Sequence, residues 1–316
     1  MKIKRIIAMA FAATLTLALH AQPKVFFTKE ITPESLVRIY KALGKEARGR
    51  VAVKISTGEA GGHNYLKPEL IGKLVKEVKG TIVECNTAYA GKRNTTESHL
   101  QVAKDHGFTK IAKVDIMDAD GDLRIPVRDT KHLKYNIVGS HLAKYDFMVN
   151  LAHFKGHAMG GFGGVLKNQS IGVASANGKA YIHTAGKAQS PAELWENLPA
   201  QDYFIESMAA SAQSVADYMK NNIIYINVMN NMSVDCDCDS HPADPKLKDM
   251  GIMASLDPVA VDQACLDKVF NYKGSEGDDP KPLIARINRQ HGTYITDYAE
   301  KIGFGSKTYV LIDLDK

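Results

Sequence analysis

Short apolar segments alternate with amphipathic segments along most of the chain. Segments typical of β-strands occur at residues 24–29, 50–56, 81–85, 111–117, 145–152, 222–229 and 308–314. Apolar positions with helical spacing occur in a segment that begins at Thr32–Pro33 and at residues 67–80, 95–108 and 258–270. This alternation favours an α/β fold with a mainly parallel or mixed sheet and helices on both faces.

The chain shows no boundary that would divide it into separate domains. Residues 22–316 contain no Pro/Gly/Ser linker, no repeat and no charge block, and the overall composition of 45% hydrophobic and 24% charged residues is typical of globular proteins. We therefore predict a single compact domain over residues 22–316. A C-terminal subdomain that begins near residue 190 is the alternative.

Residues 1–21 have the pattern of a secretory signal peptide. Lys2, Lys4 and Arg5 precede an apolar run from Ile6 to Leu19, and a small residue, Ala21, follows. A membrane-anchoring helix is the alternative, but such a helix needs about 20 apolar residues. We therefore predict a periplasmic or secreted protein that does not span a membrane.

The charge balance gives no support for a nucleic-acid partner. The formal net charge of +5 includes the three cations at the N-terminus. Without them, 37 basic and 35 acidic residues remain, a net charge of +2. A balance of this kind does not favour binding to nucleic acid or to an anionic membrane surface.

Ligands of parallel α/β sheets bind in loops beyond the carboxyl ends of the strands, and three such loops contain candidate chemistry. The first, residues 56–68, is rich in glycine and leads into a helix, so it is either an anion-binding loop or a flexible connection. The second, residues 150–172, contains His153, Lys155 and His157, followed by the glycines and polar side chains Gly160, Gly161, Gly163, Gly164, Lys167 and Asn168. This second loop matches neither a Walker A pattern nor a dinucleotide fingerprint. We predict that it binds a small anionic ligand.

The third loop contains the acidic run DCDCDSH at residues 235–241. In an extended chain, Cys236 and Cys238 point to the same side, so their thiolates could bind one metal ion. His153, His157 or His241 could complete the ligand set. A Cys236–Cys238 disulfide and a solvated acidic turn remain alternatives.

Three segments together resemble domain-of-unknown-function family 362. They are VNLAHFKGHAMGGFGGVLKNQSIG, DCDCDSHPADPKLKDMGIMASLDPVAVDQACLDKV and HGTYITDYAEKIGFGS, and the resemblance extends from about Val51 to about Ser306. Members of that family are often described as iron–sulfur centre proteins, and many relatives carry a ferredoxin-like module with C-x-x-C repeats. This chain has no C-x-x-C motif, which argues against an inherited four-cysteine cluster.

These observations lead to one hypothesis about the site. The three loops meet over the sheet, where Cys236, Cys238 and His157 bind a transition metal ion, with iron or zinc as the expected element. Lys155 and Lys167 neutralise a carboxylate or phosphate group of the ligand. The function would be that of an exported metal-dependent or redox enzyme, with electrons supplied by a protein donor. A non-catalytic anion- or metal-binding protein and a thiol–disulfide protein that uses Cys236 and Cys238 are the alternatives.

Overall fold

A computed structural model describes residues 22–316, and the predicted signal peptide lies outside this range. The strands are β1 (Lys24–Thr28), β2 (Val51–Lys54), β3 (Thr81–Glu84), β4 (Val114–Ile116), β5 (Asp122–Ile125), β6 (Asn136–Gly139), β7 (Phe147–His153), β8 (Lys155–His157), β9 (Gly161–Gly163), β10 (Ile223–Met229), β11 (Gly251–Ser255) and β12 (Val310–Asp313). The α-helices are α1 (Pro33–Ala42), α2 (Pro68–Glu77), α3 (Thr96–Asp105), α4 (Val165–Val173), α5 (Ala176–His183), α6 (Gln201–Tyr218), α7 (Pro258–Asn271), α8 (Lys281–Arg289) and α9 (Tyr294–Lys301).

Eight strands form one central sheet, which confirms the predicted α/β fold. Their order is β12-β1-β11-β10-β7-β2-β3-β4. Each neighbouring pair from β10 to β4 is parallel, whereas β11 is antiparallel to both β10 and β1. The strands that follow residue 190 belong to this same sheet, and the protein is a single compact domain.

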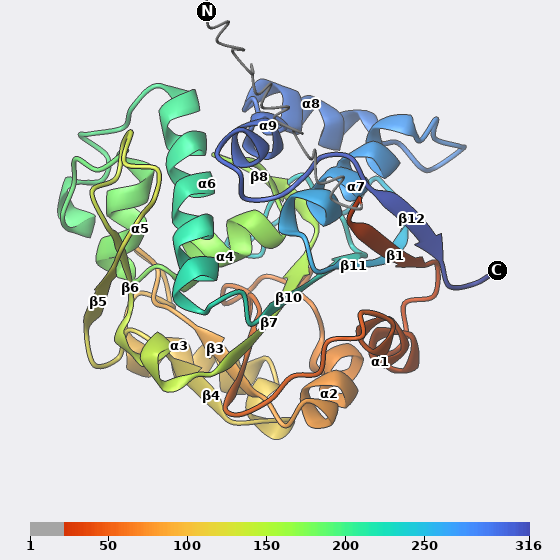
Figure 1. The fold of residues 1–316 in the computed structure, drawn as a ribbon, viewed down its shortest axis with the longest axis horizontal. Helices are drawn as coiled ribbons and strands as arrows, with labels where there is room; N and C mark the ends of the chain where they lie inside the picture. The colour runs from red at the N-terminus through yellow and green to blue at the C-terminus, as the bar shows by residue number, and fades with distance from the viewer. Residues whose placement is uncertain (1–21) are drawn as a thin grey trace, which may run out of the picture.

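Helices cover both faces of the sheet (Figure 1). On one face, α1 and α2 pack on Val53, Val149 and Ile226 of the strands. On the other face, α4, α6 and α7 pack on Ala52, Met148 and Tyr225. Adjacent residues of a strand point to opposite faces, so β7 and β10 need apolar residues at nearly every position to fill both layers. The sequence of β10, IIYINVM, has this composition, and all seven of its residues are buried.

The structure contains elements that the hydrophobic pattern did not predict. The second predicted loop includes a small hairpin, β8–β9, and its Lys167 and Asn168 lie in the first turn of α4. A second hairpin, β5–β6, precedes β7. These strands have three or four residues, too few to establish a hydrophobic period.

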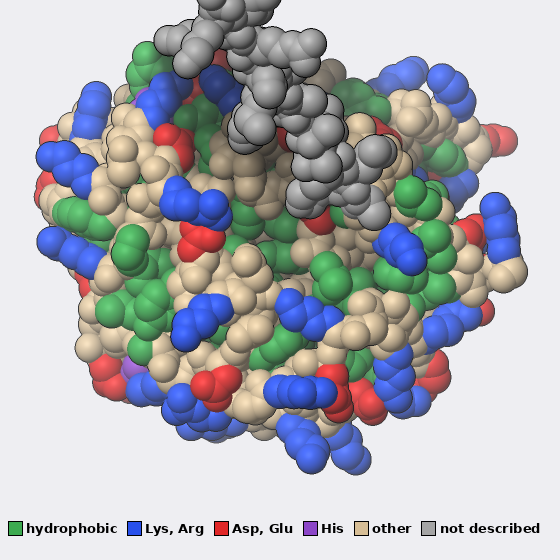
Figure 2. All heavy atoms as spheres, viewed as in Figure 1, with side chains coloured by type: hydrophobic (Ala, Val, Ile, Leu, Met, Phe, Trp, Pro, Cys, Tyr) green, Lys and Arg blue, Asp and Glu red, His purple; other side chains and the backbone are tan. Residues whose placement is uncertain are grey.

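The surface carries charges of both signs. On the face shown in Figure 2, Lys and Arg side chains are scattered among acidic, apolar and neutral atoms rather than gathered into one patch. Within residues 22–316, no helix combines the length and the apolar character that a bilayer crossing requires.

Candidate active site at the carboxyl edge of the sheet

A cavity of about 250 Å³ lies at the carboxyl edge of the parallel strands. Lys54, Glu84 and His153, the last residues of β2, β3 and β7, line it. The three predicted loops meet here. The second loop supplies much of the wall and the third supplies residues 236–238, while the first packs behind the third, where Glu59 N donates to Asp237 O at 2.7 Å. The predicted meeting of the loops is therefore present in the structure.

A buried ion pair forms the floor of the cavity. Lys54 Nζ lies 2.9 Å from Glu84 Oε2 and 3.1 Å from Asn168 Oδ1. Arg93 lies on the other side of Glu84, with Nη1 at 3.4 Å from Oε1. Burial would raise the pKa of Glu84, but the charges of Lys54 and Arg93 outweigh burial and lower it to about 2. Glu84 is therefore ionised at neutral pH.

Asp237, between the two cysteines, orients the basic side chains of the second loop. Its Oδ1 lies 2.8 Å from His153 Nδ1, and its Oδ2 lies 2.8 Å from Lys155 Nζ. Burial would raise the pKa of Asp237, but His153 and Lys155 hold it well below its usual range. His153 Nε2 contacts the carbonyl of Asn230, so both ring nitrogens of His153 are engaged by protein atoms.

His157 lies beside the two cysteines, as the sequence hypothesis predicted. The candidate ligand atoms of His157, Cys236 and Cys238 all lie within 4.8 Å of one another, a group that could hold a metal ion. His157 Nδ1 accepts hydrogen bonds from the backbone of Met159 at 3.2 Å and of Gly160 at 2.9 Å. Burial and the nearby charge of Lys167 hold the pKa of His157 well below its usual value, which keeps the ring neutral.

Cys236 and Cys238 form a disulfide bond in the structure, the competing interpretation of the acidic run. Cys236 is buried and Cys238 is partly exposed. A metal ion needs thiolates, which the disulfide does not provide. A metal ion could therefore bind these side chains only after reduction of the disulfide.

The cysteines do not fit a four-cysteine iron–sulfur cluster. Cys85 is a free, buried thiol whose Sγ donates to Val173 O at 3.3 Å, and Cys265 is buried beside Met253 with 3.7 Å between the sulfur atoms. Cys85 lines the same cavity, but neither thiol belongs to the group formed by His157, Cys236 and Cys238. A single ion bound by two thiolates and His157 fits the donor set better.

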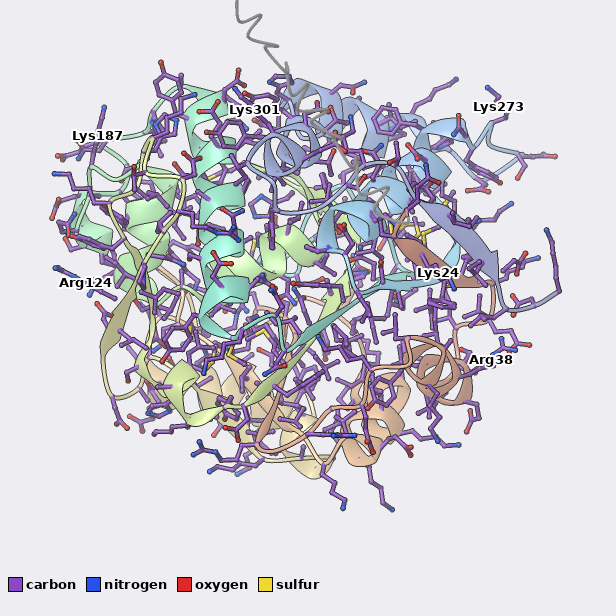
Figure 3. The ribbon with its side chains drawn as sticks, viewed as in Figure 1. Lys24, Arg38, Arg124, Lys187, Lys273 and Lys301 are labelled. Carbon is purple, nitrogen blue, oxygen red and sulfur yellow. A yellow bond between two sulfur atoms is a disulfide. The ribbon has the colours of Figure 1, made fainter. Side chains whose placement is uncertain are left out.

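Lys167 differs from the other cations of the cavity in the surroundings of its ammonium group. Among the described residues, no hydrogen bond or ion pair involves its ammonium group, whereas Lys179 Nζ donates to Ala174 O at 2.6 Å. Burial, together with the charges of Lys155 and Lys54, lowers the pKa of Lys167 to about 7. The cations labelled in Figure 3 are instead exposed to solvent.

The glycines of the second loop are positions of close packing within the protein. A Cβ on Gly164 would lie 2.3 Å from Asp262 Oδ1, and one on Gly161 would lie 2.8 Å from Gly292 Cα. Gly163 faces the side chain of Lys155, and Gly160 faces Met208 and His157. Asp262 accepts hydrogen bonds from the first backbone N–H groups of α4, so a protein carboxylate already occupies that helix end.

The other predicted residues take different places. Asn168 does not face a ligand freely, because its amide also donates to Lys54 O at 3.0 Å and to Asn150 Oδ1 at 2.8 Å. His241 is exposed, with its Nδ1 2.9 Å from Ser240 Oγ. It is not part of the sulfur group, which is formed by His157, Cys236 and Cys238. Lys155 and Lys167 both line the cavity, but Lys155 is already paired with Asp237.

Sequence reasoning missed several residues of the cavity, namely Lys54, Glu84, Arg93, Lys179, His183 and Trp195. Two of these residues could have been found from the sequence, because each is a charged residue at the end of an apolar strand. The strand VAVK ends in Lys54, and the strand TIVE ends in Glu84. No comparable signal identifies the others, which come from α5 and from loops.

Two solved structures are similar to the chain. The lactate racemase apoprotein from Thermoanaerobacterium thermosaccharolyticum has a TM-score of 0.44 and 15% identity over 77% of this chain and 56% of that one. A protein from Thermotoga maritima has a TM-score of 0.40 and 10% identity over 85% of this chain and 58% of that one. The chain thus spans a little over half the length of either protein.

Comparison at the level of sequence gives the family. No curated protein matches the chain. The family model described as "Domain of unknown function (DUF362)" matches residues 51–267, which is more than half of the 316 residues and includes the whole acidic Cys-x-Cys run. The chain therefore belongs to the DUF362 family.

Proposed function

We propose that the protein is an exported enzyme that binds a small anionic substrate in the cavity and uses Cys236 and Cys238 as its metal-binding or redox centre. The observation that carries the proposal is the position of the uncompensated Lys167 in the same cavity as the sulfur pair and His157. Lys167 is partly exposed, and a cation without a carboxylate partner inside a cavity favours an anionic ligand.

The electrostatics of the cavity support an anion rather than a cation as substrate. Within the part of the chain that the structure describes, Lys54, Lys155 and Arg93 are each paired with carboxylates, whereas Lys167 is not. An anion beside Lys167 would also raise the pKa of that ammonium group toward its ordinary value, so binding and protonation would support each other.

The sulfur pair supports metal or redox chemistry. Cys236 and Cys238 lie on the cavity wall beside His157, within reach of a bound molecule. In the reduced state they would supply two thiolates and His157 one imidazole, a set that suits zinc or iron and leaves a coordination position open. In the oxidised state the disulfide suits an oxidising compartment, which supports export.

Metal binding by the reduced protein tests the proposal. Residues 22–316 would be reduced anaerobically, incubated with Zn²⁺ or Fe²⁺ and freed of excess metal before elemental analysis. We expect near-stoichiometric metal that is lost in Cys236→Ser/Cys238→Ser and strongly reduced in His157→Ala. The His241→Ala variant is the matched control and should retain metal, because His241 lies outside the sulfur group.

Anion binding tests the other half of the proposal. Calorimetric titration with oxalate should give saturable binding to the wild-type protein, and Lys167→Met should weaken it by at least about tenfold, since about 1.4 kcal/mol corresponds to that factor. Absence of metal in the reduced protein, with the sulfur pair cycling reversibly between dithiol and disulfide, would leave the redox role. Absence of metal, of reversible cycling and of anion binding would contradict the proposal.

A further inference from the structure

Lys167 has the surroundings of a nucleophilic amine rather than those of a permanent cation. It lies in the first turn of α4, and its side chain lines the cavity. The other cationic groups that line the cavity are held by protein acceptors: Lys54 by Glu84, Lys155 by Asp237, Arg93 by Glu59 and Glu84, and Lys179 by Ala174 O. Within residues 22–316, no such acceptor holds the amine of Lys167 in its charged form.

The neighbouring cations act on Lys167 in the same direction as burial. Lys155 and Lys54 both disfavour a further positive charge, and the pKa of Lys167 falls to about 7. A substantial share of Lys167 is then the neutral amine near neutral pH. A neutral lysine in a desolvated cavity beside other cations is the form that attacks carbonyl groups.

We propose that Lys167 forms an imine with a small oxo acid that binds in this cavity. This inference rests on the anion-binding part of the proposed function and specifies its substrate class. The Nζ lone pair attacks the carbonyl carbon to form the C–N bond, and the carbonyl oxygen leaves as water. The overall step joins one amine and one carbonyl compound, releases one water and needs neither oxidant nor reductant.

Two histidines of the cavity complement this step. In the disulfide form, which provides no thiolates for a metal ion, His157 Nδ1 accepts backbone hydrogen bonds, so the proton of its neutral ring is on Nε2, which is a donor. His183 Nδ1 lies 2.7 Å from Lys179 O and donates to it, so Nε2 of its neutral ring is an acceptor. Burial lowers the pKa of His183 to about 4 and keeps that ring neutral. The cavity thus offers one donor and one acceptor for the proton transfers that accompany loss of water.

The charge and size of the cavity select the remainder of the substrate. With Lys167 neutral, the cations that line the cavity, Lys54, Arg93, Lys155 and Lys179, outnumber its lining carboxylates, Glu84 and Asp237. A substrate carboxylate would reduce that excess. A volume of about 250 Å³ restricts the ligand to a small molecule, and apolar side chains of Ile171 and Leu194 line part of the wall.

Reductive trapping tests the inference. Residues 22–316 would be incubated with glyoxylate and sodium cyanoborohydride, which reduces imines and spares disulfide bonds, and then analysed by intact mass and peptide mapping. We expect one reduced adduct per chain on the peptide that contains Lys167. Lys167→Arg keeps a long basic side chain but cannot form the imine, so the adduct should disappear, whereas Lys273→Arg, at an exposed position, should leave it unchanged.

Oxalate, an anion without a reactive carbonyl group, separates the two proposals. Oxalate binding without an adduct, or an adduct that persists in Lys167→Arg, would overturn the imine and leave the proposed anion site intact. Absence of both oxalate binding and the adduct would overturn both. A glyoxylate adduct that maps to Lys167 and is suppressed by oxalate would support both.

Discussion

At the scale of single residues, the Lys54–Glu84 pair shows how the fold sustains charge inside its core. Both side chains are almost fully buried, with exposed fractions of 1% and 5%. The pair is surrounded by hydrogen-bond partners, since Thr57 N donates to Glu84 Oε1 at 2.7 Å and Asn168 accepts from Lys54. A buried ion pair of this kind is stable only while both of its charged partners are present.

Loss of one partner should therefore be costly. We predict that Glu84→Gln lowers the free energy of unfolding by roughly 3–5 kcal/mol, because Lys54 then remains buried without its counter-charge. Urea unfolding at pH 7 measures this change. The matched control is Glu46→Gln, which breaks the exposed Arg48–Glu46 pair and should cost at most about 1 kcal/mol. Equal effects of the two substitutions would contradict the assigned role of Glu84.

The same pair predicts a dependence on pH. The pKa of Glu84 is lower in the folded protein, about 2, than its ordinary value of 4.5. A carboxylate with a lowered pKa stabilises the fold above its ordinary value, and this contribution is lost as the pH falls toward the folded value. The difference in unfolding free energy between wild type and Glu84→Gln should therefore shrink between about pH 4.5 and pH 2. A difference that grows on acidification would contradict this assignment.

Strand direction alone indicated which residues would lie at one edge of the sheet. Lys155, His157, Lys167 and the two cysteines all follow strands that end at the same edge of the sheet, and all line the cavity. The pattern could not show that Asp237 engages both His153 and Lys155, because that contact joins segments 84 and 82 residues apart. It also could not decide between thiols and a disulfide.

At the scale of elements, the N-terminus of α4 is capped by a residue from another helix. The helix has no side-chain cap of its own, because its N-cap is Gly164. Asp262 of α7 instead accepts from Val165 N at 2.9 Å and from Leu166 N at 3.0 Å. Asn227 of β10 donates to the same carboxylate at 2.7 Å. This contact ties α4, the helix that carries Lys167, to α7 and β10.

The glycine that admits Asp262 should be sensitive to substitution. We predict that Gly164→Ala destabilises the protein by about 1–3 kcal/mol, because its Cβ would lie 2.3 Å from Asp262 Oδ1 and force the cap to move. Gly160→Ala, in the same glycine run, is the control. Its Cβ would approach no atom closer than 3.4 Å, and the change should stay within about 1 kcal/mol. Urea unfolding of both variants decides the matter, and equal losses would count against the capping role.

The sequence predicted elements best where a terminus carried its own signal. Thr32 caps α1, as the sequence indicated, with its side chain accepting from Ser35 N. Asp257 likewise caps α7, and its side chain accepts from Val259 N and Ala260 N. The strand β11 escaped prediction because its neighbouring residues, 230–250, form a long irregular segment without a periodic pattern.

At the scale of the whole molecule, the central strands of the sheet are the most strongly protected from solvent. β7 and β10 are paired on both sides, and every residue in them is buried. The outer strand β12 pairs only with β1 and exposes Val310 and Leu311. Stability against local opening should therefore decrease from the centre of the sheet toward β12.

Hydrogen–deuterium exchange measures this gradient directly. We predict that the amides of β10 and β7 exchange most slowly and that those of β12 exchange fastest among the strands of the central sheet. Peptides from both regions are compared in one experiment, so each serves as the control for the other. Exchange in β12 as slow as that in β10 would indicate that the edge is protected in a way that the monomer does not explain.

The alternation of strands and helices was enough to predict the α/β class because each layer imposes its own period on the sequence. The strand order was beyond the pattern, since β11 lies antiparallel between β1 and β10. That reversal depends on the path of residues 230–250, and these residues also carry the sulfur pair. The segment that determines the antiparallel placement of β11 therefore also contains the two cysteines of the candidate site.

Trp195 lies at the cavity wall, yet its side chain is 59% exposed. It is the single tryptophan of the chain, so its fluorescence under selective excitation arises from this one position. A molecule that enters the cavity would change the hydration of the indole and shift its emission. The protein therefore carries a built-in optical reporter of cavity occupancy, suited to screening libraries of carboxylic acids without a label or an assay of turnover.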